Sequence, residues 1–221
     1  MAACPLCSAR KGKRACPALR GTICSACCGE KRVVEIACPS GCSWLGRGAE
    51  NDMRREATSY FHQQEPEKAM RWLRTVERLG FLLEMIERAV AGTAPRSVGD
   101  ADLLPALRSV HKTLESEAKG VLYEDVPTSP TAQALSRDIL AGLGVLRNAM
   151  EDPRAAPGLE GARLPHWGAA EAAECVAVLA ERCEFHLAGK AERGSLLEHL
   201  RRVYTPGAGL GVAEPPLIVL S

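Results

Sequence analysis

The 221-residue chain has few aromatic residues, only 4% of the total, although hydrophobic residues make up 46%. A folded core therefore has to be built mainly from Leu, Ala, Val and Ile. No apolar run of about 18 residues occurs, so we expect no transmembrane helix and no membrane partner. The N-terminus also lacks a basic segment followed by an apolar one, so we expect no signal peptide and a cytoplasmic location.

Motifs of catalysis are missing as well. There is no GxSxG motif, no P-loop and no Gly-rich turn after a strand. The histidines are scattered and follow no pattern of partners: His62, His111, His166, His186 and His199. We therefore expect neither an enzyme nor a small-molecule substrate.

Cysteine, in contrast, is concentrated near the N-terminus, in a segment without histidine. Eight of the 10 cysteines lie there: Cys4, Cys7, Cys16, Cys24, Cys27, Cys28, Cys38 and Cys42. Eight thiols are enough for two tetrahedral sites with only sulfur ligands. In a cytosolic protein, clustered cysteines are more often metal ligands than disulfides.

The cysteine spacing suggests how the ligands divide between two sites. Cys4 and Cys7 have the spacing of a zinc knuckle, and Cys24 is followed by cysteines at both three and four residues. The simplest allocation gives the first site Cys4, Cys7, Cys24 and either Cys27 or Cys28. The second site then takes Cys16, the remaining vicinal cysteine, Cys38 and Cys42.

This segment has too few large apolar residues to form a stable core of its own, so we expect a bound metal to stabilise its fold. Structural zinc contributes about 10–16 kcal/mol to the folding of such modules. Zinc is the expected ion because it is typical of tetrahedral sites with four cysteines. An iron–sulfur cluster, which four thiolates also hold, and unligated redox thiols are the alternatives. We expect two structural zinc ions.

The order of the cysteine pairs resembles the MYND and HIT class of small two-zinc fingers, and also the N-terminal segment of uncharacterised bacterial zinc-finger proteins. That class begins with C-x2-C, carries an internal C-S-x2-C and closes with a His- or Cys-x3-Cys pair. Cys4/Cys7, Cys24/Cys27 and Cys38/Cys42 match this order, whereas Leu19 stands where the class has the cysteine that follows Cys16. The resemblance covers about a fifth of the chain and implies binding rather than catalysis.

The same segment is basic. Residues 1–48 carry eight Lys or Arg against two Glu, a net charge of +6, which leaves −5 for the remainder of a chain whose total is +1. The candidate partner-binding residues are Arg10, Lys11, Lys13, Arg14, Arg20, Lys31 and Arg32. Two zinc centres with four thiolates each would carry about −4 and offset much of this charge. The alternative is a surface that contacts phosphates.

Helical periodicity follows the cysteine segment. Apolar residues at intervals of three and four predict a long helix from Pro66 to about Val90, whose seam faces either a bundle core or a coiled-coil partner. Further helices are expected near residues 53–61, 100–121, 130–150, 168–187 and 195–204. For the helix expected near residues 100–121, Asp100 or Asp102 is a candidate N-cap. The segment Asp152 to Pro165 reads as the longest loop.

The chain is therefore expected to be mainly α: a small N-terminal all-cysteine two-zinc module followed by a bundle of about five to six helices. The predicted domains are the zinc module at 1–48, the helical bundle at 49–204 and a tail at 205–221, whose apolar end either packs on the bundle or docks elsewhere. The favoured function is a non-enzymatic adaptor that docks a macromolecular partner, expected to be a protein. The alternative is a factor that binds RNA or DNA through the basic segment.

Overall fold

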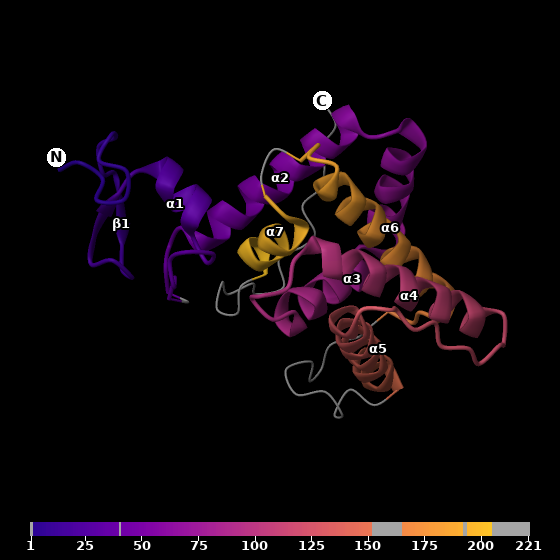
Figure 1. Cartoon of the computed structure of the whole chain (residues 1–221). Helices are drawn as coiled ribbons and strands as arrows, with labels where there is room; N and C mark the ends of the chain where they lie inside the picture. The colour runs from indigo at the N-terminus through magenta and orange to yellow at the C-terminus, as the bar shows by residue number, and fades with distance from the viewer. Residues whose placement is uncertain (1, 40, 152–164, 192–193, 205–221) are drawn as a thin grey trace. The chain divides into compact units, whose positions relative to one another are not determined.

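The computed structural model describes residues 2–39, 41–151, 165–191 and 194–204, and this part of the chain is mainly helical, as expected (Figure 1). The two short strands are β1 (Arg14–Cys16) and β2 (Gly21–Ile23). The helices are α1 (Ser25–Lys31), α2 (Leu45–Gln63), α3 (Pro66–Thr93), α4 (Asp100–Ala118), α5 (Pro130–Glu151), α6 (Ala169–Leu187) and α7 (Leu196–Val203). With α1 included, the described part holds seven helices, slightly more than the predicted number.

The described residues form two compact units. One contains those up to Thr58 together with those from Glu198 onward, and the other spans Ser59–Leu197. The predicted domain boundaries after residues 48 and 204 stay predictions. Two segments singled out in the sequence, the loop that begins at Asp152 and the tail at 205–221, lie outside the described residues apart from Pro165.

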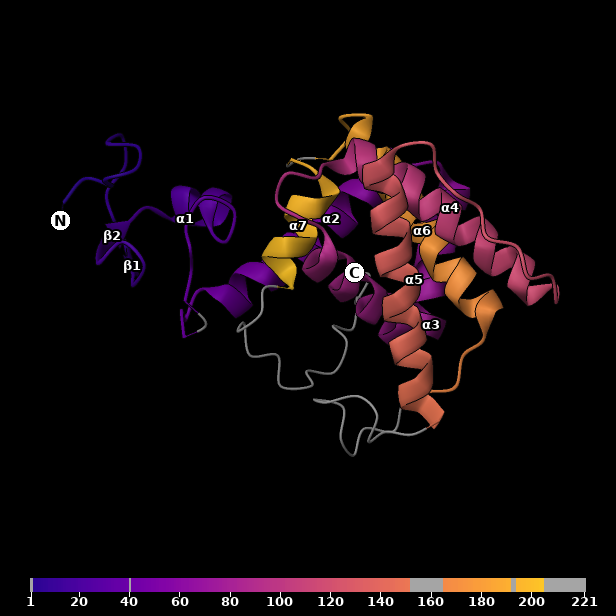
Figure 2. The same cartoon turned by 60° about the horizontal axis from the view of Figure 1, so that its bottom comes forward.

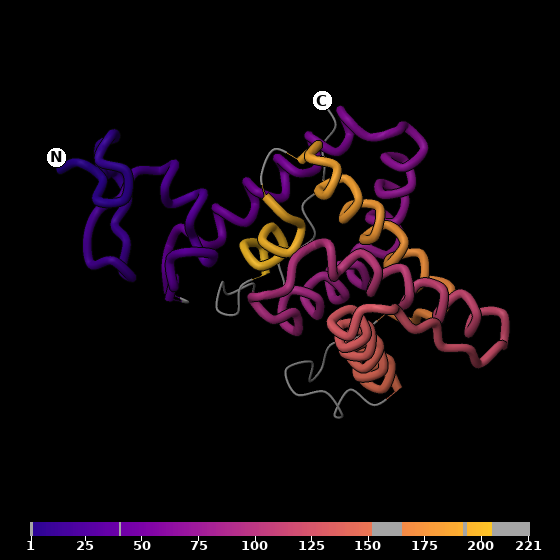
Figure 3. Tube along the Cα trace, viewed as in Figure 1, coloured from indigo at the N-terminus to yellow at the C-terminus, as the bar shows by residue number. Residues whose placement is uncertain are grey.

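In the first unit, the cysteine segment folds as a small hairpin followed by a helix (Figure 3). β1 and β2 pair antiparallel, with Cys16 opposite Gly21 and Arg14 opposite Ile23. The inward residues Cys16 and Ile23 are buried among the other cysteines, so sulfur takes the place of an apolar core. The turn of the hairpin ends at Arg20, which has a φ of +47°.

Helix α3 in the second unit confirms the predicted long helix, which begins at Pro66 because proline is well suited to the first turn. Its apolar seam is buried at Trp72, Leu83, Ile86 and Val90. The helix is kinked at Leu79, within this seam, where φ is −126° and ψ is 21°.

Helices α3 to α6 enclose the main core of the second unit. α6 packs against both α4 and α3, most extensively against α4, and α5 also packs against both of them. Figures 1 and 2 show α4 and α5 side by side. The centre is filled by aliphatic side chains, as the shortage of aromatic residues requires: Ile86, Leu103, Leu107, Val110, Leu135, Ile139 and Leu179 are all buried.

Both ends of α4 differ from the expectation. The helix ends at Ala118, before the expected end near residue 121, and Val121 is 54% exposed. Asp100 was a candidate cap for α4, but Gly99 occupies that position. The carboxylate of Asp100 instead accepts hydrogen bonds from the backbone N–H groups of Leu196 and Leu197, at 2.6 and 3.0 Å, and so caps the start of α7.

Candidate metal centre

The first pair of cysteines lies in a tight turn at the start of the chain. The backbone N–H of Cys4 donates to the carbonyl of Arg10 at 2.7 Å, and the N–H of Ser8 donates to the carbonyl of Cys4 at 2.8 Å. Ser8 has a φ of +53°, a conformation that reverses the chain at this point. This turn places the thiols of Cys4 and Cys7 on one side.

The second pair is positioned by the start of α1. Cys24 is the N-cap residue, and its sulfur accepts the backbone N–H of Cys27 at 3.3 Å. Its carbonyl accepts the N–H of Cys28 at 3.0 Å, which begins the helical hydrogen bonding. A thiolate at this position is stabilised by the positive end of the helix dipole.

Four sulfur atoms converge where these two pairs meet. The ligand atoms of Cys4, Cys7, Cys24 and Cys27 all lie within 4.8 Å of one another. The sulfurs of Cys7 and Cys24 are 3.9 Å apart. Tetrahedral zinc with bonds of about 2.3 Å to sulfur requires sulfur–sulfur distances of about 3.8 Å. The four residues therefore fit a tetrahedral metal ion, and the structure selects Cys27 rather than Cys28 for this site.

The polar groups around the site favour thiolates. The backbone N–H of Cys24 donates toward Cys4 and lowers the pKa of that thiol to about 6, although burial opposes the shift. The N–H of Cys27 likewise lowers the pKa of Cys24. The thiol of Cys27 hydrogen-bonds to the Cys24 sulfur, which raises the pKa of Cys27 to about 12. A cation held by four thiolates must displace such remaining protons, so metal binding here releases protons.

One cation of the chain itself lies against this site. The guanidinium of Arg10 hydrogen-bonds to the sulfur of Cys24, and this bond raises the pKa of Arg10. A metal ion of charge +2 with four thiolates has a net charge of −2, which a neighbouring guanidinium partly neutralises. Arg10, predicted as a partner-binding residue, therefore lies beside the candidate metal site.

Three of the remaining N-terminal cysteines, Cys16, Cys28 and Cys38, lie in the same small core. Cys16 from β1 and Cys28 from α1 are buried, and Cys38 and Cys42 are partly buried. Burial raises the pKa of Cys38, and the neighbouring thiols of Cys42, Cys16 and Cys28 raise it further. These are the four residues that the allocation left for a second site. Among the described residues, however, the first group is the one whose sulfurs reach metal-binding distance.

The two other cysteines lie apart from this cluster, in the second unit. Cys175 and Cys183 are on α6 and are fully buried. Burial raises the pKa of both thiols, that of Cys175 to about 12. They pack as small apolar side chains.

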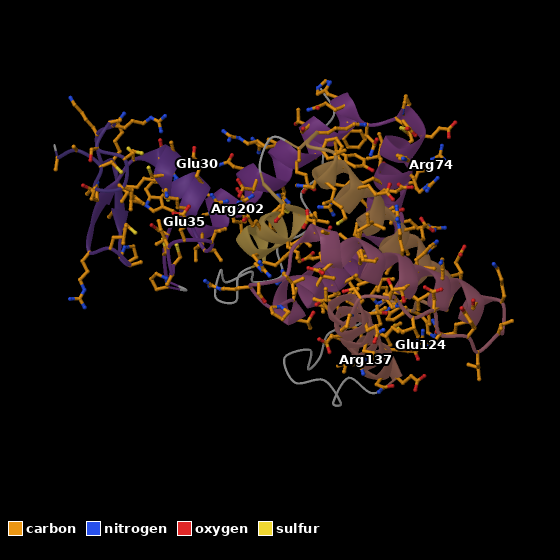
Figure 4. The ribbon with its side chains drawn as sticks, in the orientation of Figure 1. Glu30, Glu35, Arg74, Glu124, Arg137 and Arg202 are labelled. Carbon is orange, nitrogen blue, oxygen red and sulfur yellow. The ribbon has the colours of Figure 1, made fainter. Side chains whose placement is uncertain are left out.

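The predicted basic residues fall into two groups. Arg10, Lys11, Lys13 and Arg20 are exposed. The other three are less exposed: Arg14 lies over the ring of Trp44 at 4.6 Å, Lys31 pairs with Glu35 at 2.5 Å, and Arg32 is buried. Glu35, which pairs with Lys31, is labelled in Figure 4.

Arg32 belongs to a buried polar network that the sequence analysis did not foresee. Its guanidinium donates to the carbonyl of Gly48 at 2.5 Å and to the carboxylate of Asp52 on α2. Asp52 also lies 3.3 Å from Nε of Arg202 on α7 (Figure 4). Arg32, Asp52 and Arg202 are each no more than 5% exposed. A side chain on Gly48 would overlap the Arg32 guanidinium, with a Cβ only 2.6 Å from its Cζ atom.

This network connects the metal centre to the helices of the same unit, because Arg32 follows α1 directly. A second buried pair, Glu56 of α2 with His199 of α7, lies one helical turn further along. The regular spacing of apolar residues along the helices does not predict these contacts between charged residues. A possible signal was Asp52, a charged residue that directly precedes the helix expected near residues 53–61.

No known protein family model, no curated protein and no solved structure matches this chain. Among the described helices, none has the combination of length and apolar character that crossing a membrane requires.

Proposed function

We propose that this chain is a non-enzymatic adaptor whose N-terminal module is organised by two structural zinc ions. The observation that carries the proposal is the convergence of the sulfurs of Cys4, Cys7, Cys24 and Cys27 within 4.8 Å. Because the chain supplies all four ligands, a tetrahedral ion there has no open position for water or substrate. Such a site stabilises a fold and does not catalyse a reaction.

The second ion is assigned to Cys16, Cys28, Cys38 and Cys42. Its support is that Cys16, Cys28 and Cys38 share one small core, and that the neighbouring thiols of Cys42, Cys16 and Cys28 raise the pKa of Cys38. Zinc is favoured over an iron–sulfur cluster because sites with four cysteines are typical of structural zinc, and because the cysteine order resembles that of the MYND and HIT class of two-zinc fingers. Cysteines stay reduced and available as zinc ligands in a reducing compartment, so the proposal includes a cytoplasmic location.

The adaptor role is supported by where the charge lies. A domain whose structural ions are enclosed can present its outer surface to a partner, and Lys11, Lys13 and Arg20 are exposed on that surface. The same exposed cations favour the second candidate function, binding of RNA or DNA phosphates.

Metal analysis of the purified full chain tests the proposal. We expect about two zinc ions per chain, as the two sets of four cysteines require. Cys4→Ser should lower the zinc content, whereas Cys175→Ser, a matched change of a cysteine on α6, should leave it unchanged. A chain without metal, or with iron and visible colour, would show the assignment to be wrong.

The interaction itself is tested with partners captured by the full chain after chemical crosslinking in cells. We expect partners whose capture is lost in the Lys11→Glu/Lys13→Glu variant. If the captured set is the same with and without this change, the basic segment is not the docking surface. Nuclease treatment before capture separates proteins bound directly from those held through nucleic acid.

A further inference from the structure

The outer side of the β1–β2 hairpin, together with residues 11–13 that lead into β1, is basic. From Lys11 to Cys16 exposed and covered residues alternate without exception, so Lys11, Lys13 and Ala15 lie on the outer side. Ala15 is opposite Thr22, which is also exposed. We call the outer side of this segment, with Thr22 and the neighbouring Arg20, the hairpin face.

The cations of the hairpin face are not neutralised within the described part of the chain. Lys11, Lys13 and Arg20 form no ion pair with any described acidic residue, in contrast to Lys31, which is paired with Glu35. Because Ala15 and Thr22 are small, no bulky side chain separates the lysines from a ligand lying along the strands. The face is therefore open to an anionic partner.

The spacing of the charges indicates the form of that partner. Residues two apart on an extended segment are about 6.6–6.8 Å apart and point to the same side. Acidic side chains at alternate positions of an extended peptide have the same spacing as Lys11 and Lys13. We propose that the hairpin face binds an extended acidic segment of a partner protein, with carboxylates at alternate positions. This inference rests on the proposed adaptor function and adds the chemistry of the partner.

Two observations favour an acidic protein segment over nucleic acid. The single aromatic residue of the first 48 is Trp44, and the guanidinium of Arg14 covers its ring at 4.6 Å. The segment therefore has no free aromatic ring on which the bases of a single-stranded nucleic acid could stack. Moreover, the chain as a whole has a net charge of only +1, which gives little long-range attraction for a long polyanion and leaves recognition to a short acidic segment.

Binding by the zinc-loaded full chain to three fluorescein-labelled probes tests this proposal. The first is a peptide of alternating Glu and Thr, the second has the same composition with all Glu in one block, and the third is an oligo-dT of equal charge. We expect the alternating peptide to bind most tightly in fluorescence anisotropy. Lys11→Glu/Lys13→Glu should weaken its binding by about tenfold or more, because both attractions become repulsions.

A matched control is the Arg74→Glu/Lys119→Glu variant, which makes the same change in net charge at exposed positions of the second unit (Arg74 is labelled in Figure 4). Its affinity for the peptide should change less than about twofold. Zinc content and thermal unfolding of both variants should equal those of the original chain, since all four side chains are exposed.

The inference is overturned if the oligo-dT binds more tightly than either peptide, which would assign the face to nucleic acid. It is equally overturned if no probe binds, or if the hairpin variant binds the peptide as well as the original chain does. These outcomes leave the zinc content unchanged, so they are distinguishable from a failure of the proposed metal module.

Discussion

Replacing Asp52 with alanine is the most direct test of the buried network around Arg32. The carboxylate of Asp52 is shared by the guanidinium groups of Arg32 and Arg202, and all three residues are buried. The substitution removes one anion and leaves two buried cations without it. Removing one partner of a buried ion pair costs about 3–5 kcal/mol. Since domains are stable by only about 5–15 kcal/mol, the loss would be a large share of the total.

Urea denaturation followed by far-ultraviolet circular dichroism measures this change. Asp52→Ala should shift the midpoint to lower urea with an unchanged slope, as expected for a loss of stability alone. Asp52→Asn, which keeps the shape and loses the charge, should be intermediate. The control is Glu35→Ala, which removes the largely exposed partner of Lys31 and should not change the midpoint measurably.

The network also predicts an effect on metal binding. Arg32 directly follows α1, the helix that carries Cys27 and Cys28, so loosening its anchor should reduce zinc affinity in a competition with a chromophoric chelator. If Asp52→Ala loses less than about 1 kcal/mol, Asp52 does not hold two buried cations and the reasoning fails.

Three further predictions concern single residues. Asp100→Ala should lower the free energy of unfolding by about 2 kcal/mol, because the first N–H groups of α7 lose a buried cap, and an unchanged urea midpoint would contradict this. Cys27→Ser and Cys28→Ser should each remove about one zinc ion by metal analysis, from different sites, and loss of both ions in either variant would refute the allocation. Val33 has a φ of +66°, unfavourable for a β-branched residue, so Val33→Gly should stabilise the chain by about 1 kcal/mol in thermal unfolding. The matched change Val34→Gly, where φ is not positive, should destabilise it, and the same sign for both would argue against strain at this position.

Periodicity and proline placement were reliable guides to the helices because these signals are local. Pro66 begins α3 where its fixed φ suits the first turn, and the apolar residues of that helix recur at the intervals that form one buried face. The kink at Leu79 was not predictable in the same way. It precedes Gly80, and a glycine inside a helix permits a kink without requiring one.

Asp100 shows why capping was harder to predict. A carboxylate before an apolar helix is a good local cap, so the sequence pattern favoured a role in α4. In the folded chain its carboxylate lies beside the start of α7, nearly a hundred residues later, where buried N–H groups need an acceptor. No pattern in the sequence between them records that proximity.

The cysteine cluster was evident from the chain alone, because eight thiols in a short segment without a core have few other uses. The choice between Cys27 and Cys28 was not evident, since neighbouring residues on a helix point in directions about 100° apart. The direction of α1 relative to the turn at Cys4 decides which sulfur reaches the first site, and this is a property of the folded module.

The basic residues of the segment were also predictable only in part. The composition of residues 1–48 established a basic segment, because the number of cations does not depend on the fold. Which of them can meet a partner depends on their neighbours in space. Arg32 is buried with Asp52, Arg14 covers Trp44, and Lys11 and Lys13 stay exposed on the hairpin. The local spacing of residues thus specifies the helices and the type of metal ligand. Which side chains are buried or paired depends on contacts between residues far apart in the chain, and these form only when the helices and strands pack.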